Sequence, residues 1–317
     1  MWRFFWLPTV LLAQGPGWTS EREYENVRIE FEYKLDQWAE AALCLRTANV
    51  GRPVAQGVSL FLAHDFHQKE GLYTTGALAG RQKPLRLLPA SFGVWHKAEV
   101  LLDGAEFSFR LDGELLQYTS LPEELLGKGF LHWADLGHGY EVRNWKVEDL
   151  GAKQSYVEAW SPYQLRGGGG EWQLAPAAAV AANGHGIQYG APVLEDFVFV
   201  TEVKASALAN GGIFLRGSPE EGKDRGFEIQ IYPVRDAVFP TGSIYGLTRA
   251  QIASDTAARW FQLRVLVKGT HCQVWVDGVL VAESWEVPPG RGRIGLQIHN
   301  DNGQVEWRRM RAWKLAY

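Results

Sequence analysis

Short runs of alternating apolar and polar residues dominate the chain. The clearest run is 227–232, in which three apolar side chains alternate with three polar ones, Phe227, Ile229 and Ile231 with Glu228, Gln230 and Tyr232. The run 213–216 alternates similarly and ends at Arg216. Successive side chains of a strand point to opposite faces, so both runs predict strands with one apolar face and one polar face. The polar face, with its carboxylate, amide, guanidinium and phenol groups, suits a polyhydroxylated ligand.

The order of these runs occurs twice along the chain. The segment NVRIEFEYKL at 26–35 corresponds to DFVFVTEVKA at 196–205, and EFSFRLDGELL at 106–116 corresponds to HCQVWVDGVLV at 271–281. The closing segments, from 127 and from 292, also correspond. Self-similarity of this length indicates a tandem duplication. Asp112–Gly113 and Asp277–Gly278 fall between strand runs and predict hairpin turns rather than catalytic acids.

Regular short strands with almost no amphipathic helix predict an all-β fold, here two tandem jelly-roll β-sandwiches. We expect the boundaries to be a leader at 1–18, a diverged N-terminal copy at 19–152, a linker at 153–170 and a C-terminal copy at 171–317. The linker ends in four glycines, which are compatible with a flexible connection or with a tight loop. No helix follows them, so they do not predict a phosphate cradle.

Composition narrows the classes of ligand. The 317 residues carry a net charge of -4 with a pI near 6.1, and no basic stripe is visible, which argues against a nucleic-acid partner. The 14 tryptophans either fill sandwich cores or stack on sugar rings. Cys44 and Cys272 lie in strand runs and are expected to be free buried thiols.

The N-terminus has the features of an export signal. One Arg precedes an apolar run from Phe4 to Ala13, with a cleavage position after Ala13, and the run is too short to span a membrane. This predicts a signal peptide and a periplasmic or extracellular location. The alternative is a start codon set upstream of a domain that begins near Thr19. No other segment could cross a membrane.

An ordered set of motifs in the second half resembles a known family. The set comprises Gly-Ile-x-Leu-Arg, Gly-Phe-Glu-Ile-Gln-Ile, Thr-Gly-Ser-Ile-Tyr, Val-Asp-Gly and Gly-x-Ile-Gly-Leu-Gln-x-His. It resembles the 3-keto-disaccharide hydrolase domain, a concanavalin A-like lectin/glucanase jelly roll, over about 160–317 and, in diverged form, over about 20–150. The resemblance implies action on glycosides oxidised to a ketone at sugar carbon 3, in secreted or periplasmic proteins. It equally implies carbohydrate binding without chemistry, because this sandwich serves both.

A 3-keto sugar has an acidic proton at carbon 2, so cleavage needs a base, a group that stabilises the enolate and an acid for the leaving group. We predict Glu228 as the base, or as a metal-binding carboxylate, and Arg216 as the oxyanion partner. Tyr245 would donate to a sugar or leaving-group oxygen, and His299 would serve as acid or ligand. Substrate would be bound by Gln230, Tyr232 and Trp260. The alternative for Arg216 and Glu228 is a cross-strand ion pair on an exposed sheet face.

The first copy lacks this polar set. Alignment places Ser59 at Glu228, Phe61 at Gln230 and Ala79 at Tyr245, and only Arg46 keeps its counterpart, Arg216. We therefore expect no equivalent site there, and this copy would instead dock a partner or cover the second copy.

The first copy has a different group of polar residues. Asp65 and His67 share one side of an extended segment, and Asp135 or His138 would complete a set for a divalent cation. The alternative is a hydrogen-bonded loop scaffold. No cofactor is otherwise implied.

Two function classes remain after these arguments. The first is a hydrolase or lyase that cleaves 3-keto-glycosides on the polar face of the C-terminal sandwich. The second is a non-catalytic carbohydrate-binding protein in which Trp133, Trp260 or Trp285 stacks on sugar. A two-carboxylate glycosidase is disfavoured, because Glu228 has no obvious carboxylate partner on its face.

Overall fold

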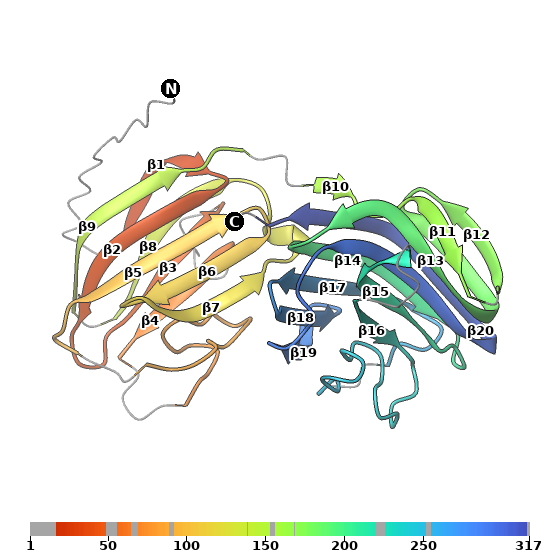
Figure 1. Cartoon of the computed structure of the whole chain (residues 1–317). Coiled ribbons are helices and arrows are strands. Elements are labelled where there is room, and N and C mark those ends of the chain that lie inside the picture. The colour runs from red at the N-terminus through yellow and green to blue at the C-terminus, as the bar shows by residue number, and fades with distance from the viewer. Residues whose placement is uncertain are drawn as a thin grey trace. The chain divides into compact units, whose positions relative to one another are not determined.

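The computed structural model describes residues 17–48, 56–64, 69–88, 92–137, 139–152, 156–167, 169–219, 226–251 and 255–315. They form two compact units, Met1–Gln154 and Ser155–Tyr317, each built from antiparallel strands (Figure 1). The all-β prediction of two tandem jelly-roll sandwiches is confirmed. No helix in the described part of the chain is long and apolar enough to cross a bilayer. The predicted signal peptide lies outside the described residues.

The described residues of the first unit form two sheets and a short 3-10 helix, η2 (Glu123–Leu125). The four-stranded sheet has the order β1-β8-β3-β4, with bounds Trp18–Tyr24, Gly129–Gly137, Glu40–Thr47 and Val58–Ala63. The five-stranded sheet has the order β7-β6-β5-β2-β9, with bounds Glu114–Ser120, Glu106–Leu111, His96–Asp103, Val27–Leu35 and Tyr140–Asp149. Alternate side chains from both sheets fill one core, which includes Trp133 and Phe31. Because Trp133 is fully buried, the hypothesis that it stacks on sugar is wrong.

Two long strands of the second unit, β13 (Ala178–Leu194) and β20 (Gly292–Lys314), each contribute to both layers. The first part of β20 pairs with β15 (Gly211–Gly217), which pairs with β16 (Phe227–Ile231). Its later part pairs with β14 (Phe197–Ala205). Beyond β14 follow β17, β18 and β19, with bounds Trp260–Lys268, His271–Val276 and Val279–Ser284. The core between the layers takes alternate residues from each, for example Ile213 and Ile229 from one layer and Phe261 and Leu263 from the other.

The stretch that the sequence predicts as a linker, 153–170, contains two short strands, and a third begins directly after it. These are β10 (Tyr156–Glu158), which pairs with β20, and β11 (Pro162–Arg166) and β12 (Glu171–Ala175), which pair with β13. Gly167, Gly169 and Gly170 all have positive φ, at 96, 116 and 102°, and they connect β11 to β12. These three glycines therefore belong to a loop between two strands of the second unit, and their φ values are accessible to glycine at little cost.

The two Asp-Gly pairs form hairpin turns, as predicted. Asp112 and Gly113 have φ values of 51 and 83°, and Asp277 and Gly278 have 48 and 78°, the signature of a type I′ turn. The carboxylates accept hydrogen bonds from the backbone N–H of Lys97 at 2.8 Å and of Gln262 at 2.9 Å. Both aspartates thus have a structural role in the hairpin turns. Both cysteines are free and buried, also as predicted.

Candidate functional site

The outer face of β15 and β16 carries a buried carboxylate. Glu228 lies opposite Phe214, and Gln230 lies opposite Gly212. The alternate residues Ile213, Ile229 and Ile231 face the core. The alternation predicted from sequence is therefore confirmed for Glu228 and Gln230, which share the face that points away from the core. We call this surface the Glu228 face.

Glu228 has little contact with water and no charged partner. Glu228 is only 9% exposed, and none of the described residues donates a hydrogen bond to its carboxylate. Burial raises the pKa of Glu228 from 4.5 to about 7, because removing a carboxylate from water disfavours its ionised form. An unpaired buried carboxylate is costly to the fold. Such a group is therefore a functional candidate rather than a structural one.

Gly212 provides the space in which this carboxylate lies. A Cβ atom built on Gly212 would be 2.0 Å from Glu228 Oε1 and 2.7 Å from its Cδ. The Glu228 side chain thus lies across the backbone of β15, where any other residue would place its own side chain. The first copy has Ala42 here, paired with Phe61 as Gly212 is paired with Gln230. A glycine at this position is accordingly a requirement of Glu228, which the sequence analysis did not identify.

Two amides flank the position of Gly212. On one side Gln230 donates from Nε2 to Asn210 Oδ1 at 2.8 Å. On the other side, Gln297 of β20 lies opposite Gly212, is half-buried and has no side-chain hydrogen bond among the described residues. Gln297 is a second residue that the sequence analysis missed. Gln297 could have been found from the sequence, because it lies two residues before His299 and two after Gly295 in the motif that carries the family resemblance, so that all three residues share one face of a strand.

The remaining predicted residues of this face lie around Glu228. The backbone N–H of Tyr245 donates to Glu228 O at 2.9 Å, and its side chain is 54% exposed beside Phe239. Tyr232 follows β16 and is half-buried. His299 is exposed two residues beyond Gln297 on β20, with its ring edge-on to His185 at 4.9 Å. Tyr245 is thus the nearest of these to Glu228 in strand register, and His299 lies at the border of the face.

The prediction that Arg216 serves as an oxyanion partner is wrong. Arg216 has φ 56° at a register shift of β15, so the strand alternation ends before it. Its guanidinium is buried, donates to the carbonyls of Glu195, Gly269 and Pro288, and pairs with Asp196 at 2.9 Å. An ion pair between Arg216 and Glu228, the alternative hypothesis, is excluded by the same contacts. Burial lowers the pKa of Arg216, and the Asp196 carboxylate opposes that effect.

The first copy repeats the same arginine arrangement. Arg46 has φ 52° and donates to the carbonyls of Glu25, Gly104 and Leu125 and to Asn26 Oδ1. These partners occupy the positions that serve Arg216 in the second copy. An arginine that is present in both copies with the same backbone partners belongs to the architecture of the sandwich.

The backbone contacts are also the same in both copies at positions where the side chains differ. Ala79 N–H donates to Ser59 O at 2.8 Å, as Tyr245 N–H does to Glu228 O. The corresponding face of the first copy is apolar, because Ala42, Cys44, Phe61, Ala77 and Ala134 pack together there. The predicted loss of the polar set in the first copy is confirmed.

Trp260 does not belong to the Glu228 face. It begins β17, where Phe261 and Leu263 point into the core, so that Trp260 and Gln262 point outward from the other layer. Glu228 and Trp260 are therefore on opposite outer faces of the sandwich. The prediction that Trp260 binds substrate beside Glu228 is wrong, because alternation within one strand does not tell which layer that strand joins.

The metal candidates of the first copy are largely outside the described residues, namely Asp65, His67 and His138. Asp135 is described, and its Oδ1 accepts the Gly137 N–H at 3.0 Å. Within the described residues, no three His, Cys, Asp or Glu side chains lie close enough to hold a metal ion.

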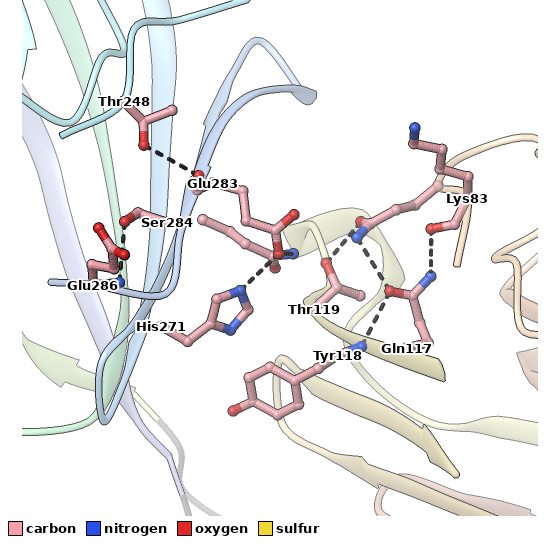
Figure 2. A network of polar contacts seen from close by, with 11 residues as sticks. Lys83, Gln117, Tyr118, Thr119, Thr248, His271, Glu283, Ser284 and Glu286 are labelled. Carbon is pink, nitrogen blue, oxygen red and sulfur yellow. Dashed lines mark hydrogen bonds and ion pairs between the residues drawn. The ribbon is translucent and has the colours of Figure 1, made fainter. Parts of the chain in front are cut away.

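Each unit also contains a cluster of hydrogen-bonded polar side chains. On β18 and β19 of the second unit, Glu283 Oε1 lies 2.7 Å from His271 Nε2 and accepts from Gln273 at 2.9 Å (Figure 2). In the first unit, Gln117 donates to Lys83 O at 3.0 Å and accepts the Tyr118 N–H (Figure 2). Glu283 thus has bonding partners of the kind that Glu228 lacks.

The chain is thus a tandem all-β sandwich protein with one polar face built around a carboxylate. It belongs to the family of 3-keto-alpha-glucoside-1,2-lyase-like domains, whose sequence model matches residues 13–148 and 127–312. The two matched regions agree with the tandem duplication. Family membership connects the chain with carbohydrates. No curated protein matches the sequence.

Several solved structures are similar to about half of the chain. A protein provisionally described as a glycosyl hydrolase from Parabacteroides distasonis is 19% identical, with 45% of this chain and 90% of that chain covered and a TM-score of 0.40. The carbohydrate binding module CBM66 from Bacillus subtilis is 14% identical, with coverage of 50% and 96% and a TM-score of 0.38. A β-glucanase from Bacillus licheniformis is 12% identical, with coverage of 51% and 97% and a TM-score of 0.38. None of these likenesses identifies a ligand or an activity.

The raised pKa of Glu228 predicts a pH-dependent effect on stability. The pKa in the folded state lies above the unfolded value, so the contribution of this group to stability is fully present below about pH 4.5 and is lost as the pH rises through about 7. The difference between the folded and unfolded pKa values of Glu228 corresponds to about 3 kcal/mol in the free energy of unfolding. We expect Glu228→Gln to unfold at nearly the wild-type temperature at about pH 4.5 and at a higher temperature than wild type at about pH 8.

Calorimetric melting of both proteins across this range measures the effect. Glu286→Gln, a change at an exposed carboxylate, is the control and should melt with wild type at every pH. A Glu228→Gln difference that does not change with pH would show that the carboxylate is not desolvated.

Proposed function

We propose that the second unit cleaves glycosides that carry a ketone at sugar carbon 3, by elimination across carbons 1 and 2. The observation that carries this proposal is the buried, unpaired Glu228 carboxylate, whose pKa of about 7 suits a general base at neutral pH. The ketone acidifies the neighbouring proton at carbon 2, which is the proton that such a base would remove. Export to the periplasm or the cell exterior is proposed with it, on the N-terminal sequence alone.

The residues of the Glu228 face have complementary roles in this reaction. Glu228 takes the proton from carbon 2, and the electrons of that bond form an enolate with the ketone oxygen. Gln297, whose amide is without a partner among the described residues, donates to the enolate oxygen in place of Arg216. The enolate collapses to a double bond between carbons 1 and 2 as the bond from carbon 1 to the leaving group breaks. Tyr245 or His299 gives that oxygen its proton, and water then adds to the unsaturated product.

The test is turnover of a 3-keto-glucoside as a function of pH. Because the base must be ionised, we expect kcat/KM to be low in acid and to rise with an apparent pKa near 7. The released alcohol and the unsaturated sugar are both measured, with and without a chelator, which also tests the requirement for a divalent cation. Binding of the sugar without any product would instead favour a carbohydrate-binding protein, and a rate that falls as the pH rises through 7 would exclude Glu228 as the base.

A further inference from the structure

The second unit has a hollow of about 330 Å³ on the outer face of the layer that contains β14 and β17, the layer opposite the Glu228 face. The hollow is lined by Ala178 and Val180 of β13, by Gln173 of β12, by Trp260 of β17 and by Arg308 of β20. Val180 lies opposite Glu306 and Ala178 opposite Arg308, so these two lining residues of β13 are next to charged residues of β20. The volume lies at the lower end of the range typical of small-molecule sites. We call this feature the Trp260 hollow.

The charged groups of the Trp260 hollow compensate one another. Arg308 donates from Nε to Glu202 at 2.6 Å, and Glu306 lies 3.5 Å from Lys204 Nζ. The hollow itself is lined by one cation, Arg308, and one anion, Glu306. A strongly charged ligand of either sign would meet a like charge, so the electrostatics favour a neutral ligand.

The remaining polar groups are arranged for hydrogen bonding next to an aromatic ring. Arg308 stacks over Trp260 with its guanidinium carbon 3.9 Å from the ring centroid, which holds the indole in place. The Trp260 indole N–H, the Gln173 amide and the terminal nitrogens of Arg308 have no partner among the described residues. An aromatic surface surrounded by unsatisfied donors and acceptors matches a sugar ring, which has apolar C–H faces and a rim of hydroxyls.

We propose that the Trp260 hollow is a second, non-catalytic binding site for a neutral oligosaccharide. It is distinct from the Glu228 face, because the two lie on opposite outer faces of the sandwich. Its role is to hold the protein on a glycan while the Glu228 face acts on another sugar. Binding at the hollow does not require that the proposed elimination takes place, so either proposal can fail without the other.

The experiment is calorimetric titration of the full chain with two neutral probes, maltohexaose and cellohexaose. Titrations are done in the Glu228→Gln background, which removes turnover. We expect at least one hexaose to bind with a Kd of about 0.1–1 mM. Trp260→Ala should weaken that binding at least about 10-fold, and Gln173→Ala about 3-fold, through loss of the ring contact and of one hydrogen-bonding group.

Trp285→Ala is the matched control, since Trp285 is 51% exposed and lies outside the hollow. It should leave the Kd unchanged, and Trp260→Ala should leave cleavage of a small 3-keto-glucoside unchanged. Circular dichroism shows whether Trp260→Ala is folded, and if it is not, the exposed Gln173 decides the result. The proposal is overturned if neither hexaose binds at about 10 mM, if the hollow variants bind as well as the parent, or if Trp285→Ala alone loses binding.

Discussion

Glu228→Gln should reduce turnover of a 3-keto-glucoside at least about 1,000-fold while the protein stays folded. The amide has nearly the shape of the carboxylate and fits the same space above Gly212, but it cannot accept the proton from carbon 2. The expected loss is in kcat, with KM nearly unchanged, because the side chain would act on the reacting proton rather than on binding. Steady-state kinetics at about pH 8, with product identified by mass spectrometry, measure it.

The tandem copy provides a matched control for this substitution. Ser59 occupies the position of Glu228 in the first unit, so Ser59→Ala should retain full activity. Gly212→Ala tests the geometry, because its new Cβ would occupy the place of the Glu228 carboxylate. That variant should also lose activity although its carboxylate remains. Full turnover by Glu228→Gln would remove Glu228 from the reaction and the proposed function with it.

The sequence was sufficient for the fold because the relevant signals are local. Alternation with a period of two marks the strands, and Asp-Gly marks hairpins since both residues tolerate positive φ. The linker prediction failed for the opposite reason. Pro162–Arg166 pairs with β13, with Pro162 opposite Gly190 and Arg166 opposite Ile187, and local composition does not indicate pairing across such a separation.

Part of the Glu228 face was also predictable. The sequence predicts that Glu228 and Gln230 share one face of the sheet, because they are two residues apart on a regular strand, and the structure confirms this. Arg216 was misplaced because a register shift at the end of β15 reverses its side chain, and residue types alone do not show where such a shift occurs. The role of Gly212 cannot be predicted from the sequence. It depends on the absence of a side chain where Glu228 lies, and this is known only once the position of the Glu228 side chain is known.

Comparison of the two copies indicates that Arg216 has a structural role. Side chains needed by the sandwich should persist in a copy that has lost its site, and those needed only by the site need not. Arg46 persists and repeats the contacts of Arg216, whereas Glu228, Gln230 and Tyr245 are replaced. The difference between copies is therefore a better guide to function than polarity on a strand.

Arg216→Met should destabilise the second unit by about 3–5 kcal/mol, the range found when one partner of a buried ion pair is removed. The substitution leaves Asp196 without its cation and three carbonyls without their donor. Because these carbonyls belong to segments far apart in the sequence, their loss should lower the melting temperature of the whole unit. Differential scanning calorimetry measures the shift, and turnover of the remaining folded protein at low temperature is measured beside it.

Arg309→Met is the matched control, because Arg309 also has positive φ, at 55°, but its side chain is 67% exposed and pairs with Glu202 at the surface. An exposed ion pair contributes at most about 1 kcal/mol, so this variant should melt close to wild type. Arg46→Met should destabilise the first unit less, because it leaves three carbonyls and the Asn26 amide oxygen without their donor but leaves no carboxylate without its cation. If Arg216→Met instead lost turnover without a change in melting temperature, Arg216 would belong to the reaction, and its equivalence to Arg46 would not reflect a shared structural role.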